Sequence, residues 1–328
     1  MAPHVRPRVF VTRQLPGEAL DRLGRYVELQ VWEDELPPPR ETLLERVRNV
    51  EGLITLLTDK VDAALLAAAP SLRAVSNVAV GYDNIDVQAC SARRIPVGNT
   101  PGVLTETTAD FAFAMLMGLA RKVAEADAYV RAGRWRTWSP TLLLGADIHG
   151  ATLGLVGLGQ IGAAVARRAR GFGMRVLYVN RHPRPELEAE LGLRRVDKAT
   201  LLAESDFVSL HVPLTPETRH WVGRAELAAM KPGAMLINTT RGPVVDQAAL
   251  AEALAQGKLG GAALDVTDPE PLPMDSPLLK LPNVLLAPHI ASASHATRGL
   301  MASMAVDNLL AALEGRRPPH CVNPELFS

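Results

Sequence analysis

Short apolar runs recur along most of the chain, and a segment of helical or turn character follows each one. The runs are continuously apolar rather than alternating, which is typical of strands buried on both faces. Repeated strand-then-helix units predict parallel sheets covered by helices. Strands are expected at Arg8–Thr12, Gly52–Leu57, Leu72–Val80, Thr152–Gly157, Met174–Val179, Asp206–Val212, Ala234–Asn238, Gly261–Val266 and Asn283–His289.

Two longer segments have the periodicity of helices. The first, "NTPGVLTETTADFAFAMLMGLARKV", contains the helix-start signal Thr100-Pro101-Gly102, and the second, "ASASHATRGLMASMAVDNLLAALEG", ends at Gly315. We expect these helices to join two α/β lobes, each a doubly wound parallel sheet of Rossmann-like or flavodoxin-like type. The predicted domains are residues 1–100 with 291–328, and residues 101–290.

The composition favours a globular protein without a highly charged partner. Hydrophobic residues make up 48% of the 328 residues, and Lys+Arg and Asp+Glu both total 35, so the net charge is zero. Nucleic-acid and membrane-surface binding generally require a basic excess, so neither partner is expected. Cys90 and Cys321 lack metal-ligand spacing, and no run is long enough for a membrane span. We expect a reduced, cytoplasmic protein without a metal site.

A glycine-rich turn directly follows one expected strand. Gly157, Gly159 and Gly162 form a GxGxxG pattern between Thr152–Val156 and a helical segment. The first glycine allows a tight turn, the second lets a pyrophosphate approach the backbone, and the third lets the helix pack close to the sheet. The helix N-terminus adds partial positive charge. The motif predicts a dinucleotide site, and a tight turn without a ligand is the alternative.

A basic loop follows the next expected strand, which ends at Val179. An NAD site commonly presents an acid here to the ribose 2′-hydroxyl, but this chain has Asn180, Arg181 and His182. A carboxylate would repel a 2′-phosphate, whereas a guanidinium binds it through bidentate bonds. The loop therefore predicts a preference for NADPH, with Arg184 as a further cation and NADH as a possible cofactor. A solvated surface loop is the alternative.

Three segments follow expected strands where open parallel sheets bind ligands, and they supply Arg241, Asp265, Glu270 and His289. Reduction of a ketone leaves negative charge on the carbonyl oxygen, and His289 is a suitable acid to protonate it. Glu270 could fix the imidazole tautomer and favour the imidazolium. Arg241 could bind a substrate carboxylate and polarise the carbonyl. Taken singly, each residue could instead have an ordinary role in a turn or loop.

Several long motifs resemble those of the D-isomer-specific 2-hydroxyacid dehydrogenases, and the resemblance covers nearly the whole chain. The motifs are "VAVGYDNID", "GLVGLGQIG", "LHVPLTPETRH", "INTTRG", "LDVTDPEPLP" and "PHIAS". Within the family, "NTPGVLTETTAD" and "WSP" make the chain most similar to the glyoxylate/hydroxypyruvate reductases. The resemblance implies NAD(P)H-dependent reduction of small 2-oxo acids, glyoxylate to glycolate and hydroxypyruvate to D-glycerate. The discontinuous domain would then bind substrate, and residues 101–290 the dinucleotide.

The resemblance also implies roles for individual residues. The backbone N–H groups of Val80 and Gly81, with Arg241, would bind the substrate carboxylate, and His289 with Glu270 would form the acid–base pair. Asp265 would contact the nicotinamide carboxamide. Further cofactor contacts would come from Gln160, Ile161, Val212, Pro213 and Thr239.

The segment "RAGRWRTWSP" contains Trp135 and Trp138. The resemblance implies a homodimer through the nucleotide-binding domain, with this arm around the partner, and Trp138 is hypothesised to line the neighbouring subunit's substrate pocket. Two other functions stay open. They are a dinucleotide-sensing corepressor on the same fold and a phosphite dehydrogenase-like enzyme with the same Arg–Glu–His set.

Overall fold

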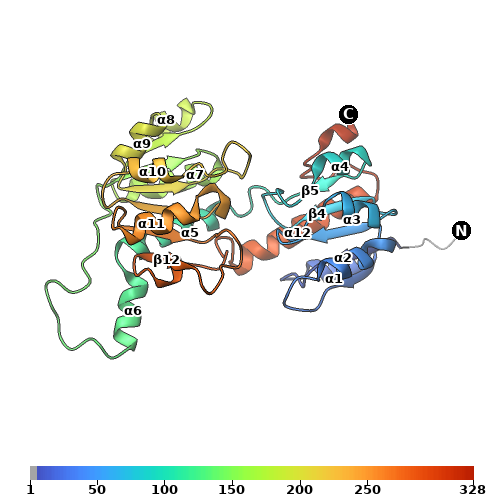
Figure 1. Cartoon of the computed structure of the whole chain (residues 1–328). Helices are drawn as coiled ribbons and strands as arrows, with labels where there is room; N and C mark the ends of the chain where they lie inside the picture. Colours follow the sequence, from blue (N-terminus) through green and yellow to red (C-terminus); the bar gives the residue numbers. More distant parts are fainter. Residues whose placement is uncertain (1–5) are drawn as a thin grey trace, which may run out of the picture. The chain divides into compact units, whose positions relative to one another are not determined.

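Two parallel sheets organise residues 6–328, the part of the chain that the computed structural model describes (Figure 1). The chain forms two compact units. Unit 1 comprises the chain up to Leu104 together with Ala293–Ser328, and unit 2 comprises Thr105–Ser292. The chain therefore passes from one unit to the other just before each of the two long helices predicted from the sequence.

The sheet of unit 1 has the strand order β2-β1-β3-β4-β5, and every pairing is parallel. Its strands are β1 (Arg8–Val11), β2 (Glu28–Val31), β3 (Gly52–Thr55), β4 (Ala74–Asn77) and β5 (Val97–Gly98). The helices of the unit are α1 (Ala19–Gly24), α2 (Arg40–Arg46), α3 (Ala63–Ala68), α4 (Val87–Ala92) and α12 (His295–Leu313). Short 3₁₀ helices, η1 and η4, lie at Val47–Asn49 and Pro324–Phe327.

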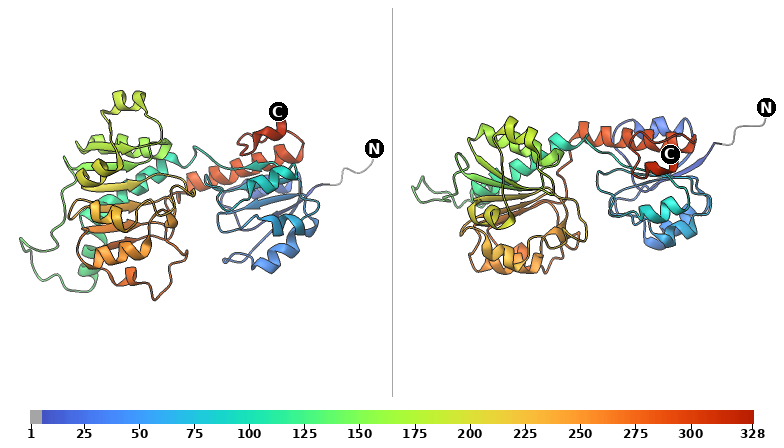
Figure 2. Two further views of the ribbon diagram at one scale, coloured as in Figure 1. Left: turned by 45° about the horizontal axis from the view of Figure 1, so that its top comes forward. Right: turned by 90° about the horizontal axis from the view of Figure 1, so that it is seen from above.

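Helices cover both faces of the sheet in unit 1 (Figure 2). On one face, Phe10, Leu53 and Val75 join an apolar cluster with residues of α2, α3 and α4. On the other, α12 packs against β3 and β4 with α1 beside it. Close approach of α12 requires a small residue in β5, because a Cβ at Gly98 would lie 2.6 Å from the Asn308 Cβ. Burial on both faces explains why the strands read as continuous apolar runs.

The sheet of unit 2 has the order β12-β11-β10-β9-β6-β7-β8, again with parallel pairings throughout. Its strands are β6 (Thr152–Val156), β7 (Arg175–Val179), β8 (Arg194–Arg195), β9 (Phe207–Leu210), β10 (Met235–Asn238), β11 (Gly261–Leu264) and β12 (Val284–Leu286). The helices are α5 (Thr105–Ala120), α6 (Val123–Arg131), α7 (Gln160–Gly171), α8 (Pro185–Leu191), α9 (Lys198–Glu204), α10 (Arg224–Ala229) and α11 (Gln247–Ala255), with η2 (Gly242–Val244) and η3 (Pro277–Lys280).

Successive residues of the central strands enter two different cores in unit 2. Phe207 and Ile237 pack with residues of α5 and α7, whereas Val208 and Leu236 pack with residues of α9, α10 and α11. The strand order reverses at β6, which pairs with β7 on one side and β9 on the other. Open α/β sheets bind their ligands beyond the carboxyl ends of the strands at such a switch point. The carboxyl edge of this sheet is therefore where the fold predicts a ligand-binding site.

The predicted fold class is confirmed, and each strand expected from the sequence is present. Three further strands, β2, β5 and β8, were not predicted. No helix among residues 6–328 has both the length and the apolar content needed to cross a membrane.

Candidate active site

The glycine-rich turn has the geometry that its sequence predicts. Gly157 follows β6 with φ +96°, and a Cβ there would lie 2.4 Å from the carbonyl oxygen of His211, so no side chain fits. A Cβ at Gly162 would lie 2.3 Å from the carbonyl oxygen of Gly157, which explains the third glycine. At Gly159, the N-cap of α7, a Cβ would meet nothing within 4 Å. The first and third glycines let the backbone pack closely, and the middle one leaves the helix N-terminus open.

The residues around this turn fit a dinucleotide. No side chain caps the N-terminus of α7 at Gly159, so its first N–H groups are available to phosphate oxygens. Thr239 follows β10 at the same sheet edge, and its Oγ1 is buried without a partner among residues 6–328. His211 follows β9, and its Nε2 lies 2.9 Å from Ser209 Oγ while its Nδ1 is likewise buried without a partner in that range. Burial lowers the pKa of His211 to about 4, so this ring is neutral at pH 7.

The basic loop after β7 is tied to the glycine-rich turn. Asn180 Oδ1 accepts a hydrogen bond from Leu158 N at 3.3 Å, and Asn180 Nδ2 donates to the carbonyl of His182 at 2.9 Å. Arg181 is exposed, and its positive charge contributes to a lowered pKa of Glu217, mainly set by the hydrogen bond from Thr215. Arg184 forms an ion pair with Glu186 at 3.0 Å. Arg181 is therefore better placed than Arg184 to meet an incoming phosphate.

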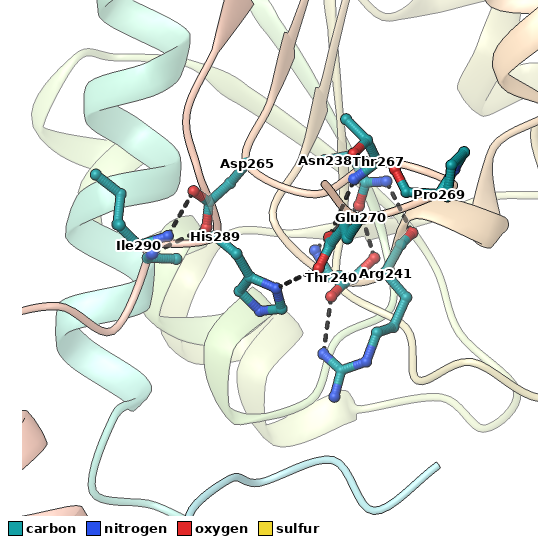
Figure 3. A network of polar contacts seen from close by, with 10 residues as sticks. Asn238, Thr240, Arg241, Asp265, Thr267, Pro269, Glu270, His289 and Ile290 are labelled. Carbon is teal, nitrogen blue, oxygen red and sulfur yellow. Dashed lines mark hydrogen bonds and ion pairs between the residues drawn. The ribbon is translucent and has the colours of Figure 1, made fainter. Parts of the chain in front are cut away.

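His289 and Glu270 form a directly hydrogen-bonded pair (Figure 3). The Nδ1 of His289 lies 2.9 Å from Glu270 Oε2, and Thr267 N donates to the other carboxylate oxygen at 3.1 Å. Burial raises the pKa of Glu270, but the bond and charge of His289, Thr267 N–H and the charge of Arg241 outweigh it and hold that pKa below its usual value. A carboxylate on Nδ1 leaves Nε2 as the ring nitrogen that can act on a ligand.

Asp265 holds the segment that carries His289. The residue is buried at the end of β11, and its two carboxylate oxygens accept hydrogen bonds from Ile290 N at 2.7 Å and Ala291 N at 2.8 Å. Its carbonyl accepts from His289 N at 2.8 Å. His289 has φ +57°, a left-handed conformation that costs free energy in a non-glycine residue. Three bonds to one residue thus stabilise a strained backbone at the position of the imidazole. Asp265, His289 and Ile290 are labelled in Figure 3.

Arg241 lies in the loop after β10. The Nδ2 of Asn238 donates to the backbone carbonyl of Arg241 at 2.9 Å, and Arg241 Nη1 donates to the carbonyl of Thr240 at 2.9 Å. The structure thus brings Arg241, Asp265, Glu270 and His289 together with the glycine-rich turn along the carboxyl edge of one sheet. The charges of His289 and Arg241 both contribute to the lowered pKa of Glu270.

The remaining candidates fall in three places. Val80 and Gly81 lie in unit 1, in the turn after β4, and both are partly exposed. Val212 and Pro213 follow β9 in unit 2 and precede a loop in which Thr218 Oγ1 donates to the carbonyl of Pro213 at 2.6 Å. Trp138 is 78% exposed in the segment after α6.

Several residues near these sites were not predicted. Arg195, on β8, donates to the carbonyls of Asn180 at 3.3 Å and Arg181 at 3.4 Å, and so supports the basic loop. Asn77 and Asn99 hold the turn at Val80 through their side chains. Each of the two asparagines follows or ends an apolar run, and this position was the sequence signal that could have identified them. No group of three or more His, Cys, Asp or Glu side chains within residues 6–328 could hold a metal ion.

Comparisons with known proteins agree with this geometry. Residues 113–291 match the family model described as D-isomer specific 2-hydroxyacid dehydrogenase, NAD binding domain. A glyoxylate reductase of Korarchaeum cryptofilum is 56% identical over 323 residues, which are 98% of this chain and 97% of that protein. A glyoxylate reductase of Thermococcus litoralis is 51% identical over 328 residues and covers 99% of both chains.

Solved structures are similar over nearly the full length. A protein from Thermus thermophilus superposes with a TM-score of 0.91 and 52% identity, covering 96% of this chain and 99% of that one. An NADPH-dependent glyoxylate/hydroxypyruvate reductase from Sinorhizobium meliloti, solved with NADP and malonate, has a TM-score of 0.83 and 37% identity, covering 97% of each chain.

Proposed function

Because this chain belongs to the D-isomer specific 2-hydroxyacid dehydrogenase family, we propose that its physiological reaction is the NADPH-dependent reduction of glyoxylate and hydroxypyruvate. The chain is an NAD(P)-dependent oxidoreductase that acts on small 2-oxo acids. The observation that carries the proposal is the His289–Glu270 pair beside Arg241, at the same sheet edge as the glycine-rich turn. A corepressor that only senses a dinucleotide has no need of such a pair.

The cofactor lies along the glycine-rich turn in this proposal. Gly157, Gly159, Gln160, Ile161 and Gly162 surround its pyrophosphate at the N-terminus of α7, where backbone N–H groups and the helix dipole favour negative charge. When bound, the reduced nicotinamide supplies the hydride. The other contacts come from the loops after β7, β9, β10 and β11, through Asn180, His182, Val212, Pro213, Thr239 and Asp265. For Asp265, the carboxylate already accepts two backbone N–H groups, so any contact with the carboxamide is additional.

Arg181 selects NADPH. Asn180 replaces the acid that would repel a 2′-phosphate, and it fixes the loop against the glycine-rich turn. Arg181 is exposed beside it, whereas Arg184 is already paired with Glu186. The S. meliloti relative, described as NADPH-dependent, supports the same preference here.

Each residue expected to meet the substrate has its own role in this proposal. The N–H groups of Val80 and Gly81 bind its carboxylate, and the Arg241 guanidinium binds the carboxylate and the reacting carbonyl. Negative charge develops on the carbonyl oxygen, and the protonated His289 donates a proton to that oxygen from Nε2. Glu270, ionised because its pKa is lowered, stabilises the imidazolium from the Nδ1 side. We assign substrate binding to residues 1–100 with 291–328, and dinucleotide binding to residues 101–290.

A homodimer through the nucleotide-binding domain also belongs to this proposal. No residue of α6 is buried, and the helix and the following segment expose Val123, Val130, Trp135, Trp138 and Leu144. A second copy of the chain would cover these apolar side chains. Trp138 would then limit side-chain size in the partner's substrate pocket. A cytoplasmic location stays a prediction that rests on the two free cysteines.

One assay tests the proposed function. Purified protein is mixed with NADPH or NADH and, in turn, with glyoxylate, hydroxypyruvate, pyruvate and a bulkier 2-oxo acid, while cofactor oxidation is followed by absorbance. We expect turnover with glyoxylate and hydroxypyruvate and a higher kcat/KM with NADPH. Reduction of NADP⁺ by phosphite, without any oxidation of NADPH by a 2-oxo acid, would instead assign the phosphite chemistry. Cofactor binding without turnover on any of these substrates would favour the dinucleotide-sensing alternative.

A further inference from the structure

The turn after β4 in unit 1 has its carbonyl groups held from three directions. The backbone N–H of Thr100 donates to the carbonyl of Ala79 at 2.9 Å. The Nδ2 atom of Asn99 donates to the next carbonyl along the chain, at 2.8 Å, and Nδ2 of Asn77 donates to the carbonyl of Gly81 at 2.9 Å. Three successive peptide carbonyls are therefore fixed by one backbone group and two carboxamides.

Fixing these carbonyls also fixes the neighbouring N–H groups. Within a planar trans peptide, the C=O of one residue and the N–H of the next point in opposite directions. The bond from Thr100 therefore orients Val80 N–H, and the bond from Asn99 orients Gly81 N–H. Residues 6–328 provide no hydrogen-bond acceptor for these two donors. The turn presents two oriented N–H groups, an arrangement that favours an anion.

We propose that Asn77 is the positioning residue of this anion-binding turn, and this inference rests on the proposed binding of a substrate carboxylate at Val80 and Gly81. Asn77 ends β4 and its side chain is 0% exposed, so it acts on a ligand only through the turn. The carbonyl of Gly81 is solely an acceptor, so the nitrogen of the Asn77 amide must face it. The bond fixes the peptide plane that closes the turn behind the two donors.

A network across the sheet edge holds the Asn77 amide in this orientation. Thr55, at the end of β3, donates its hydroxyl to Asn77 Oδ1 at 3.1 Å. Asn77 Nδ2 also lies 3.2 Å from Asn84 Oδ1, and Asn84 Nδ2 donates to the carbonyls of Leu56 at 3.0 Å and Asp59 at 2.9 Å. The polar atoms of Asn77 are thus satisfied on every side, which favours one rotamer over alternatives.

Ser76 offers a matched control on the same strand. It precedes Asn77, is also 0% exposed, and points to the other face of the sheet, where its Oγ is buried without a partner among residues 6–328. Replacing Ser76 or Asn77 with alanine therefore perturbs the same strand at the same depth. Only the second replacement removes a bond to the turn.

The test compares Asn77→Ala with Ser76→Ala in the full-length protein. For Asn77→Ala, we expect KM for glyoxylate and the competitive inhibition constant of oxamate to rise roughly ten- to hundredfold, because a small misplacement of binding groups has effects of this size. The dissociation constant of NADPH, measured by fluorescence, should stay within about twofold, because unit 2 is untouched. Ser76→Ala should leave all three values unchanged. A variant that was merely less stable would lose active protein, and so apparent kcat, but would keep its KM.

The outcomes separate this inference from the proposed function. A wild-type protein that does not turn over any 2-oxo acid refutes the proposed function. Wild-type turnover with an unchanged KM in Asn77→Ala refutes only the positioning role. If Asn77→Ala does not fold, Thr55→Val decides instead, because it removes the bond that orients the amide and keeps the shape of the side chain. A severalfold rise in KM in Thr55→Val supports the inference, and an unchanged KM overturns it.

Discussion

The carboxyl edges of the two parallel sheets carry different kinds of polar group. Beside the turn at Val80 in unit 1, Asn77 and Asn99 are uncharged and engage the backbone. Along the edge of unit 2, Glu270 and His289 form a hydrogen-bonded pair of ionisable side chains. Similar strand–loop–helix units therefore produce one edge that carries neutral amide dipoles and one edge that carries ionisable groups. The loops, rather than the architecture, determine which chemistry each edge supplies.

Burial explains this division. Asn77 is completely buried, and a neutral carboxamide with all its hydrogen bonds made costs little there, whereas a charge would cost much more. The side chains of His289 and Glu270 are 24% and 33% exposed, so water still solvates part of the pair. In the proposed function, the groups that change charge lie where a charge can be accommodated. Groups that must keep one geometry lie in the core.

The largest expected effect separates the two edges by removing the proton donor. His289→Ala should lower kcat by roughly 10²–10⁴-fold, the range attributed to a general acid, and leave the NADPH dissociation constant nearly unchanged. Steady-state kinetics and a fluorescence titration on the same preparation measure both. His149→Ala is the matched control, because His149 precedes β6, at the opposite end of the strand from the glycine-rich turn. Near-normal turnover in His289→Ala would remove His289 from the mechanism.

The next effect concerns the partner of His289. Glu270→Gln should lower kcat roughly a hundredfold, because a neutral amide no longer stabilises the imidazolium. The lowered pKa of Glu270 means that its pairing stabilises the fold above the ordinary carboxyl pKa, and that this contribution is lost as pH falls through the lowered value. The Tm of wild type should therefore exceed that of Glu270→Gln near neutral pH, and this difference in Tm should be smaller in strong acid. A difference in Tm that increases in acid would contradict the assignment.

A smaller effect tests the cofactor loop of unit 2. Arg181→Ala should reduce the ratio of kcat/KM for NADPH to that for NADH about tenfold or more, because a charge-assisted contact to the 2′-phosphate is lost. Arg184→Ala is the control, since Arg184 is already paired with Glu186, and its ratio should change little. An equal decrease of this kcat/KM ratio in Arg181→Ala and Arg184→Ala would indicate a general effect of positive charge. A wild-type enzyme with no preference would show that the loop is solvated surface.

The smallest effect concerns the exposed arm. Trp138→Ala should alter the relative kcat/KM for glyoxylate and a bulkier 2-oxo acid by a few fold, because a large side chain would no longer limit the pocket. Trp135→Ala, in the same arm and 60% exposed, is the control for loss of an exposed indole. Unchanged selectivity in Trp138→Ala would refute its role, and sedimentation of the wild type would test the dimer separately.

The sequence predicts the long buried strands well, because strands covered on both faces read as continuous apolar runs. β2 was missed because its side chains are partly exposed at the sheet edge, and β5 and β8 because two residues give no pattern. The glycine-rich turn and the His289–Glu270 bond were predictable, since each lies within a recognisable motif. Asn77 was not singled out, because it resembles any polar residue at a strand end.

The remaining parts of the site depend on backbone bonds between distant segments. Asp265 and the segment at Ile290 are far apart in sequence, and nothing in either motif indicates that the carboxylate accepts its N–H groups. Likewise, Arg195 reaches the carbonyl of Asn180 only because β8 pairs with β7. Sequence motifs identify the residues that are proposed to meet a ligand. The residues that position them become visible only when the chain is folded.

The pH dependence of reduction in Glu270→Gln and Asn77→Ala tests the contrast between the two edges most directly. We predict that the alkaline fall in kcat moves to lower pH in Glu270→Gln, because the imidazolium has lost its carboxylate. In Asn77→Ala, the shape of the kcat profile should match wild type while KM is raised at every pH. A shifted profile in Asn77→Ala, or an unshifted one in Glu270→Gln, would contradict the division between positioning and proton transfer.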